Sequence, residues 1–435
     1  MYRSLFIFIL LSCFLTCQRK HTTLFVRTIK PIVSDTQTQA KRGNPPNNCA
    51  DKMNYIPDAA HPDHFPMRYL RVNFHIMRKG DGQGHFNEKE GVAYVQDMMK
   101  LAEGKLNSNN PMNLPPGNNI PAPLTKYRYL LTPDPARSND DGIYFHNDDE
   151  LYYMLRSGRH KNIFDRKVYD KYGIQKDTVM NIFIMADHAD SLASKTYKSH
   201  WYGVGMGAFN KVTSGYSRMK KARARNDISR LNYHRYAACN NLNHEIGHSL
   251  GLQHTWRGND GCEDTPNNPN CWNEKDPNKS NCGTLASNNV MDYNTYNNAW
   301  SPCQVGSVHQ KFSYIGKSSA STRKYLLPVW CEFNPERSIT ITDKIIWNGA
   351  RDLEGNIEIK AGGELTIRCR VSMPPGGKIK VFPGGRLILD GGILENACGK
   401  KWLGIELVDE TNPDLAVVAI GTPVIKDVVN EVIVE

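Results

Sequence analysis

The sequence predicts an α+β domain built on a mixed twisted sheet, followed by an all-β, solenoid-like module. Three observations carry this prediction. Strand and helix periodicities are interspersed through the first two thirds of the chain, a histidine-rich helix signature lies at 244–254, and short β runs separated by Gly-Gly turns follow Pro335. A chain of 435 residues exceeds one compact core, so more than one domain is expected.

The α+β domain, 61–330, begins with a strand at Arg68–Met77, where alternate residues are apolar. A helix follows at Asn87–Leu106, with apolar residues at helical spacing. The remaining predicted elements are a strand at 126–132, a short helix at 150–158, a buried central strand at 178–187, an edge strand at 203–209 and the helix that carries the histidines.

The β-rich module, 337–435, contains an internal repeat. Asn356–Ile367 aligns with Lys378–Leu389, and both copies place Gly-Gly between apolar pairs of period two. Such repeats favour stacked β-coils, which must lean on a neighbour or a cap to bury their faces. Two unrelated hairpins are the alternative.

The first residues have the features of an export signal, 1–19, in which Arg3 precedes the apolar run Leu5–Leu11. That run is too short to span a membrane. Cys13 and Cys17 both sit where a bacterial lipoprotein is acylated, so secretion and a cell-surface lipid anchor are both open. A polar linker or pro-segment, 20–60, follows.

Export implies an oxidising compartment and hence disulfides. Nine cysteines remain after the signal, so at least one is unpaired within the chain. The sequence contains no CxxC pair, so a cysteine-rich zinc knuckle is not expected. A structural disulfide is expected for Cys49 rather than an inhibitory contact with a metal.

The net charge of +10 includes the basic run Arg218–Arg225. No aromatic residues interleave with this run and no nucleic-acid-binding motif occurs elsewhere, so no nucleic-acid partner is expected. We expect the run to be an exposed, solvated loop before a helix.

The stretch HEIGHSLGLQH, 244–254, has the spacing of a metal site. His244 and His248 lie four apart on one helix face, and Glu245 reaches the same cleft without joining the coordination shell. Gly251 can take a positive φ, end the helix and turn the chain, so His254 can return as a third ligand. Three imidazoles and one glutamate predict a Zn²⁺ site with a general base.

With the downstream CEDTP and VMDYN segments, this motif resembles the metzincin metalloproteases, and among them the pappalysin group. The resemblance implies that Met291 is the methionine of the turn below the metal and that Tyr293 stabilises an oxyanion. It also implies a disulfide between Cys262 and Cys282, for which Cys271 competes, and a calcium (Ca²⁺) site that would use Asp260, Glu263 and Asp264. The Asn- and Lys-rich segment 271–282 departs from a calcium loop.

We therefore expect a secreted zinc-dependent endopeptidase that acts on proteins or peptides. A surface adhesin with a structural or vestigial zinc site is the alternative from another class, and a zinc amidase acting on a non-protein substrate is a second one. The carboxylate of Glu245 distinguishes the first two, since a structural site needs no adjacent general base.

Overall fold

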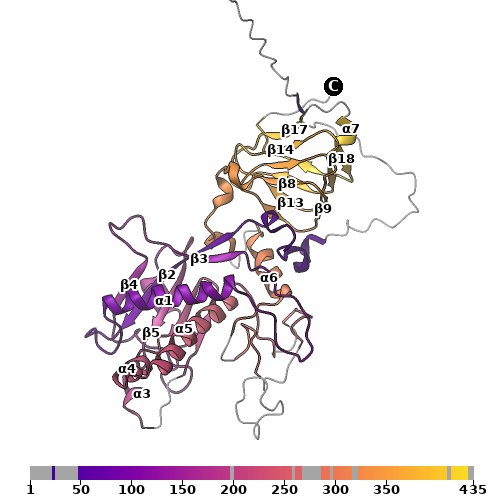
Figure 1. Cartoon of the computed structure of the whole chain (residues 1–435). Helices are drawn as coiled ribbons and strands as arrows, with labels where there is room; N and C mark the ends of the chain where they lie inside the picture. Colours follow the sequence, from indigo (N-terminus) through magenta and orange to yellow (C-terminus); the bar gives the residue numbers. More distant parts are fainter. Residues whose placement is uncertain are drawn as a thin grey trace, which may run out of the picture.

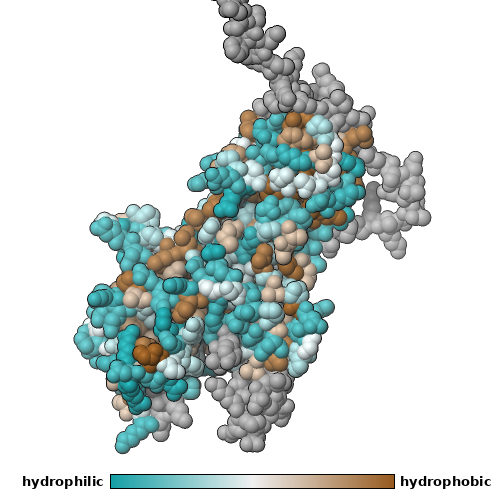
Figure 2. Space-filling view, viewed as in Figure 1, coloured by the Kyte–Doolittle hydropathy of each residue, from teal (hydrophilic) through white to brown (hydrophobic). Residues whose placement is uncertain are grey.

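The computed structural model describes residues 22–24, 48–195, 200–256, 260–266, 286–293, 297–315, 322–408 and 413–429. Two bodies lie end to end, an α+β domain and a stack of short strands (Figure 1). On the face drawn in Figure 2, polar residues spread over both bodies. Within the described residues no helix is long and apolar enough to cross a membrane. The predicted export signal, with Cys13 and Cys17, lies outside these residues.

The α+β domain is built on one mixed sheet of strand order β3-β2-β5-β7-β6. Its long strand β2 pairs in parallel with β3 through Arg68–Val72 and with β4 through Phe74–Arg78. β6 is the antiparallel edge. The strands are β2 (Arg68–Arg78), β3 (Tyr127–Leu131), β4 (Ile143–Asn147), β5 (Met180–Met185), β6 (Gly203–Gly205) and β7 (Phe209–Thr213).

Two long helices, α1 (Glu88–Asn107) and α5 (Ile228–Ser249), cover one face of this sheet. α1 begins with a capping box between Asn87 and Glu90, which satisfies backbone donors of the first turn. The other face packs against the segment 151–169 and against α2 (Lys167–Tyr172). α3 (Ala189–Ala193), α4 (Tyr216–Ala224) and α6 (Pro302–Phe312) complete the helices of this domain.

The predicted strands at 68–77, 126–132 and 178–187 and the helix at 87–106 are all present, with small shifts at their ends. The predicted short helix at 150–158 is wrong, because Tyr152 and Met154 are buried and the segment instead bridges to the end of β5. The basic run is also not a loop, since α4 contains most of it. The sequence pattern did not indicate β4, β7, α2, α3 and α6.

The C-terminal module is a three-sided stack of parallel strands with four coils. The two copies of the repeat lie in adjacent coils in the register that their alignment predicts: Ile357 pairs with Ile379, and Leu365 with Leu387. The first coil is β8 (Ile339–Ile341), β9 (Lys344–Trp347) and β10 (Arg351–Asp352). The second is β11 (Ile357–Ile359), β12 (Glu364–Ile367) and β13 (Arg370–Ser372).

The third coil is β14 (Lys378–Val381), β15 (Arg386–Asp390) and β16 (Ile393–Glu395). The fourth is β17 (Gly404–Leu407), β18 (Val417–Ile420) and β19 (Val424–Ile425), with the short helix α7 (Pro413–Ala416) before β18. β1 (Thr22–Leu24) adds to β17 as an antiparallel strand and covers the last coil.

The first and second glycines of each Gly-Gly turn have different structural roles. Gly362 and Gly384 have φ values of +81° and +78°, which L side chains rarely adopt. At Gly363 and Gly385 an added Cβ would lie 2.3 and 2.6 Å from a carbonyl oxygen of the preceding coil. The first glycine makes the turn, and the second lets the coils approach.

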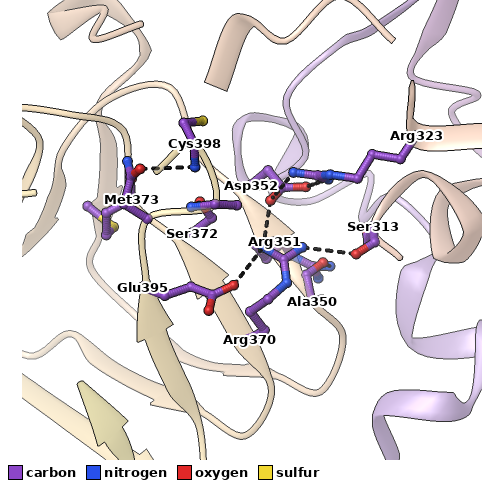
Figure 3. A network of polar contacts seen from close by, with 12 residues as sticks. Ser313, Arg323, Ala350, Arg351, Asp352, Arg370, Ser372, Met373, Glu395 and Cys398 are labelled. Atoms are coloured by element: carbon purple, nitrogen blue, oxygen red, sulfur yellow. Dashed lines mark hydrogen bonds and ion pairs between the residues drawn. The ribbon is translucent and has the colours of Figure 1, made fainter. Parts of the chain in front are cut away.

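The two bodies meet through covalent and polar contacts. Disulfides Cys49–Cys369 and Cys331–Cys398 join segments of the α+β side to the stack. The carboxylate of Asp352, in the first coil, accepts hydrogen bonds from Arg323 at 3.0 Å and Arg370 at 2.7 Å (Figure 3). Arg370 also donates to the Ser313 carbonyl at 3.1 Å, after α6. Cys49 is thus in a structural disulfide, as expected.

Candidate active site

Helix α5 presents its polar face to a cleft and its apolar face to the core. Leu242, Ile246 and Leu250 are completely buried, so His244 and His248, which lie on another face of the same turns, are directed away from the core. The helix ends at Ser249, and Gly251, two residues later, has a φ of +88°. The Leu252 N–H donates to the Gly247 carbonyl at 2.9 Å, which closes a left-handed cap of the kind that glycine permits.

The turn brings three imidazoles together. The Nε2 atoms of His244, His248 and His254 lie 3.0 to 3.1 Å from one another. Ligands about 2.0–2.1 Å from a tetrahedral zinc ion would be about 3.3 Å apart, so this spacing fits one metal ion. Among the described residues, these histidines are one of two groups close enough to share an ion, and the other contains a disulfide.

Backbone carbonyls fix two of the rings. His244 Nδ1 lies 2.8 Å from the Val290 carbonyl, and His248 Nδ1 lies 2.9 Å from the Leu252 carbonyl. A carbonyl only accepts, so each Nδ1 carries the proton and each Nε2 directs a lone pair inward. Burial lowers the pKa of His244 to about 3, which keeps its ring neutral, as a metal ligand must be.

Glu245 lies beside the histidines, between α5 and the edge strand β6. Its side chain is 4% exposed, and burial raises its pKa to about 8 against the opposing effect of the Gly205 N–H and of Arg156. A cation at the three nitrogens would favour the ionised carboxylate. A carboxyl group with a pKa near neutrality in a cleft has the properties of a general base.

The segment after Val290 forms the floor of the site. Met291 is completely buried, and its Sδ lies so close to Gly247 that an added Cβ there would be 2.7 Å away. The Met291 N–H donates to Asn289 at 2.8 Å, which holds the turn. The next side chain, Asp292, accepts a hydrogen bond from Thr255, so the floor is tied to the segment that carries His254.

Tyr293 is 43% exposed and faces the same cleft. Its ring centroid lies 5.8 Å from that of His244 and 5.1 Å from that of His254. Trp256 stacks on His254 at 4.1 Å and contacts the Tyr293 ring at 4.4 Å. Trp256 was not predicted as a site residue, although it lies only two residues beyond the third histidine.

The cleft has a volume of about 1200 Å³. Apart from Tyr293, the aromatic residues that line the cleft were not predicted from the sequence; they are Phe164, Trp201, Tyr202, Tyr233, Tyr236 and Trp256. Helical spacing could have found some of them, because Tyr233, Tyr236 and Asn240 continue the stripe of His244 and His248 toward the start of α5.

A buried lysine supports one wall of the cleft. Lys211, in β7, donates to the carbonyls of Asn162 at 2.6 Å and Asp165 at 2.7 Å. These carbonyls bracket Ile163 and Phe164, which line the cleft. No sequence pattern pointed to this contact, because the two segments lie almost fifty residues apart.

The loop after the zinc motif differs from expectation. Cys262 pairs with Cys303 at the start of α6, so the predicted Cys262–Cys282 disulfide is wrong. The motif showed only that Cys262 needs a partner, and the packing of α6 beside it supplies one. Cys282 and its competitor Cys271 lie outside the described residues. Cys239 is buried and free, as the odd number of cysteines required.

Two of the three acidic residues predicted for calcium accept hydrogen bonds from protein groups. Asp264 accepts hydrogen bonds from Ser301 and from the Cys303 N–H at 2.7 and 2.8 Å, and so caps α6. Asp260 accepts from Thr265 at 2.6 Å. In the described part of the chain, these two and Glu263 do not form a cluster close enough to share an ion.

Comparisons with known proteins agree with the motif. Residues 162–312 match a peptidase family model described as pregnancy-associated plasma protein-A. This range contains the histidines, Glu245 and the Met291 turn. No curated protein sequence gives a significant match.

Solved structures of mirolysin are also similar to this chain. Mirolysin in complex with compound 9 is 16% identical to this chain, with a TM-score of 0.40. The matched region covers 60% of this chain and 96% of the mirolysin chain. Mature mirolysin of Tannerella forsythia, in complex with a cleaved peptide, is 15% identical with a TM-score of 0.36 and covers 60% and 95%. These TM-scores are low, so the relation to a known family rests on the match of residues 162–312 to the family model.

Proposed function

Because residues 162–312 belong to the pappalysin family of metzincin zinc metalloendopeptidases, we propose that this chain is an exported enzyme that cleaves proteins or peptides with Glu245 as general base. The observation that carries the proposal is the meeting of three Nε2 atoms within 3.1 Å beside that buried carboxylate. Three disulfides among the described residues support export to an oxidising compartment.

Each residue of the site has its own role in the proposed reaction. His244, His248 and His254 would hold zinc, which supplies Lewis acidity and lowers the pKa of a bound water. Glu245 accepts a proton on its carboxylate as water attacks the scissile carbonyl, and later returns it to the leaving amine. The Tyr293 hydroxyl donates a hydrogen bond to the developing oxyanion. Met291 supports the histidines as an apolar floor.

The test is Glu245→Ala, assayed for casein or gelatin cleavage and for zinc content. We expect bound zinc to be retained and kcat to fall by about 10²–10⁴-fold, the usual contribution of a positioned general base. A chelator should abolish cleavage by the unmodified chain. Glu150→Ala is the matched control, because Glu150 is exposed in the same domain. Full activity of the Glu245 variant would rule out this mechanism.

The alternatives make different predictions for the same assays. A surface adhesin with a structural zinc site would bind zinc and cleave no protein under any condition. A zinc amidase would cleave non-protein amides and leave a peptide library intact. We propose, by analogy with modules appended to secreted enzymes, that the β-stack binds a substrate or a surface.

A further inference from the structure

One wall of the cleft contains a tight turn, 162–165, that exposes an aromatic side chain. The Asp165 N–H donates to the Asn162 carbonyl at 3.0 Å, which closes the turn. Of the two residues between them, Ile163 is 5% exposed and packs in the hydrophobic cluster on the face of the sheet opposite α5. Phe164 is 62% exposed and lines the cleft. The turn is therefore anchored by Ile163 and presents Phe164 to a molecule that enters the cleft.

A buried lysine holds the two ends of the same turn. Lys211 is 2% exposed, and its Nζ donates to the carbonyls of Asn162 at 2.6 Å and Asp165 at 2.7 Å. The Tyr202 hydroxyl donates to the Met154 carbonyl at 2.6 Å, which fixes the chain ahead of the turn. Lysine is seldom buried, and burial lowers the pKa of Lys211 to about 8. The fold therefore accepts the desolvation of an ammonium group in order to fix this turn.

Lys211 also connects the turn to the edge strand beside Glu245. It is the ladder partner of Val204 in β6, and the glycines on either side of Val204 approach Glu245 so closely that neither has room for a Cβ. The preceding side chain, Asn210, contacts α5, so Lys211 extends from the other face of β7. Phe164 and Glu245 are thus positioned from opposite faces of the sheet at its edge, and both line the cleft.

Phe164 is one of several exposed aromatic residues in this cleft. Tyr233, Tyr236 and Tyr293 are also exposed and line it. A single exposed aromatic residue needs no explanation, but several in one groove indicate an apolar ligand. The ammonium group of Lys161 lies 5.6 Å from the centre of the Phe164 ring, which is a weak cation–π contact. Most of the ring surface therefore stays accessible to a ligand.

We propose that Phe164 forms a subsite for a bulky apolar side chain of the peptide substrate, near the scissile bond, and that Lys211 is the positioning residue that holds this subsite. The proposal rests on the proposed peptidase function and names a substrate class for it, peptides with an aromatic or a large aliphatic residue at one position. Packing of that residue on the ring stabilises the bound peptide by removing apolar surface from water. Lys211 does not touch the substrate and acts through the two carbonyls of the turn.

The first experiment maps the cleavage sites of the unmodified full chain in a peptide library by mass spectrometry. We expect one position near the scissile bond to be enriched in Phe, Tyr, Leu and Met. Two peptides that differ only there, with Leu or Ser, are then compared, and we expect kcat/KM to favour the Leu peptide by about 10-fold, chiefly through KM. If no peptide is cleaved, the proposed function itself is wrong. Cleavage without such a position contradicts only the subsite.

Variants then assign the preference to the turn. Phe164→Ser should lower the preference for Leu over Ser by about 10-fold, whereas Phe333→Ser, at an exposed position outside the cleft lining, should keep it. Lys211→Met should lower it as well. Lys176→Met is the control, because the Lys176 ammonium group also donates to a backbone carbonyl but lies outside the cleft lining.

The double variant separates positioning from a structural role. If Lys211 acts through Phe164, the combined change should lower the preference no further than either single change. A merely structural role of Lys211 would lower kcat for both peptides equally and keep their ratio, which would overturn the positioning role. A preference that survives Phe164→Ser would overturn the subsite. Phe164→Ser changes an exposed residue and still decides if Lys211→Met does not fold.

Discussion

The chemistry of the site depends on how a few side chains are oriented. The carbonyls of Val290 and Leu252 accept hydrogen bonds from Nδ1 of His244 and His248, so both rings direct the lone pairs of Nε2 to one point. Burial raises the pKa of Glu245, and Tyr293 is partly exposed beside the histidines. The two carbonyls that orient the rings belong to residues that are not themselves predicted ligands, so the site depends on its surroundings as well as on the histidines.

Tyr293 provides the prediction at this scale. Tyr293→Phe removes the hydroxyl that would donate to the oxyanion and keeps the ring that packs against Trp256. We expect kcat to fall by about 10²-fold with little change in KM, since the lost interaction forms in the transition state. Tyr314→Phe, at an exposed position after α6, is the control. An unchanged kcat would assign Tyr293 to substrate packing only.

At the scale of elements, the site depends on the close approach of strand β6 to helix α5. At Gly203 an added Cβ would lie 2.5 Å from Cγ of Glu245, and at Gly205 it would lie 2.3 Å from the Glu245 carbonyl oxygen. Two glycines therefore let the edge strand form the wall of the cleft against the carboxylate of Glu245. Larger residues would move either the strand or the glutamate.

Gly203→Ala tests this approach. The new methyl group should displace the Glu245 side chain, and a displacement of about 1 Å can lower activity by about 10²-fold while zinc content stays unchanged. Gly104→Ala is the matched control, because nothing lies within 4 Å of a Cβ at that position in α1 and alanine favours a helix by about 1 kcal/mol. Equal activity of both variants would show that β6 yields without moving Glu245.

At the scale of the whole molecule, Asp352 joins the two bodies. Burial alone would raise the pKa of Asp352, but Arg370 and Arg323 outweigh it and hold the pKa well below its usual range. Because the folded pKa lies below the unfolded value of about 3.9, the carboxylate stabilises the fold above that pH. This stabilisation is lost as the pH falls from about 4 toward the folded pKa.

Asp352→Asn removes the charge between its arginines and should lower the free energy of unfolding by about 3–5 kcal/mol near neutral pH. The difference from the unmodified chain should shrink below pH ~4, where the unmodified carboxylate also becomes protonated. Denaturant unfolding over a pH series measures both effects. Asp390→Asn, whose partner Arg368 is partly exposed, should change stability by only about 0–1 kcal/mol. Equal losses in the two variants would contradict a special role for Asp352.

The sequence alone determined whatever depends on spacing along a short stretch. Helical period placed His244, Glu245 and His248 in one cleft, the conformational freedom of Gly251 returned His254, and a repeat of period-two pairs predicted the register of two β-coils. Each of these depends on backbone geometry within about thirty residues, which sequence spacing encodes directly. The helix predicted at 150–158 failed because burial against the sheet overrode its local pattern.

Tertiary structure decided the pairings between distant segments. The bond between Cys262 and Cys303, the contact of Lys211 with the cleft wall and the arginines around Asp352 all join segments far apart in the chain. A cysteine or an arginine has many chemically equivalent partners in a sequence of this length. Only packing selects one of them, because it fixes which distant elements lie within bonding distance and which charges are buried together.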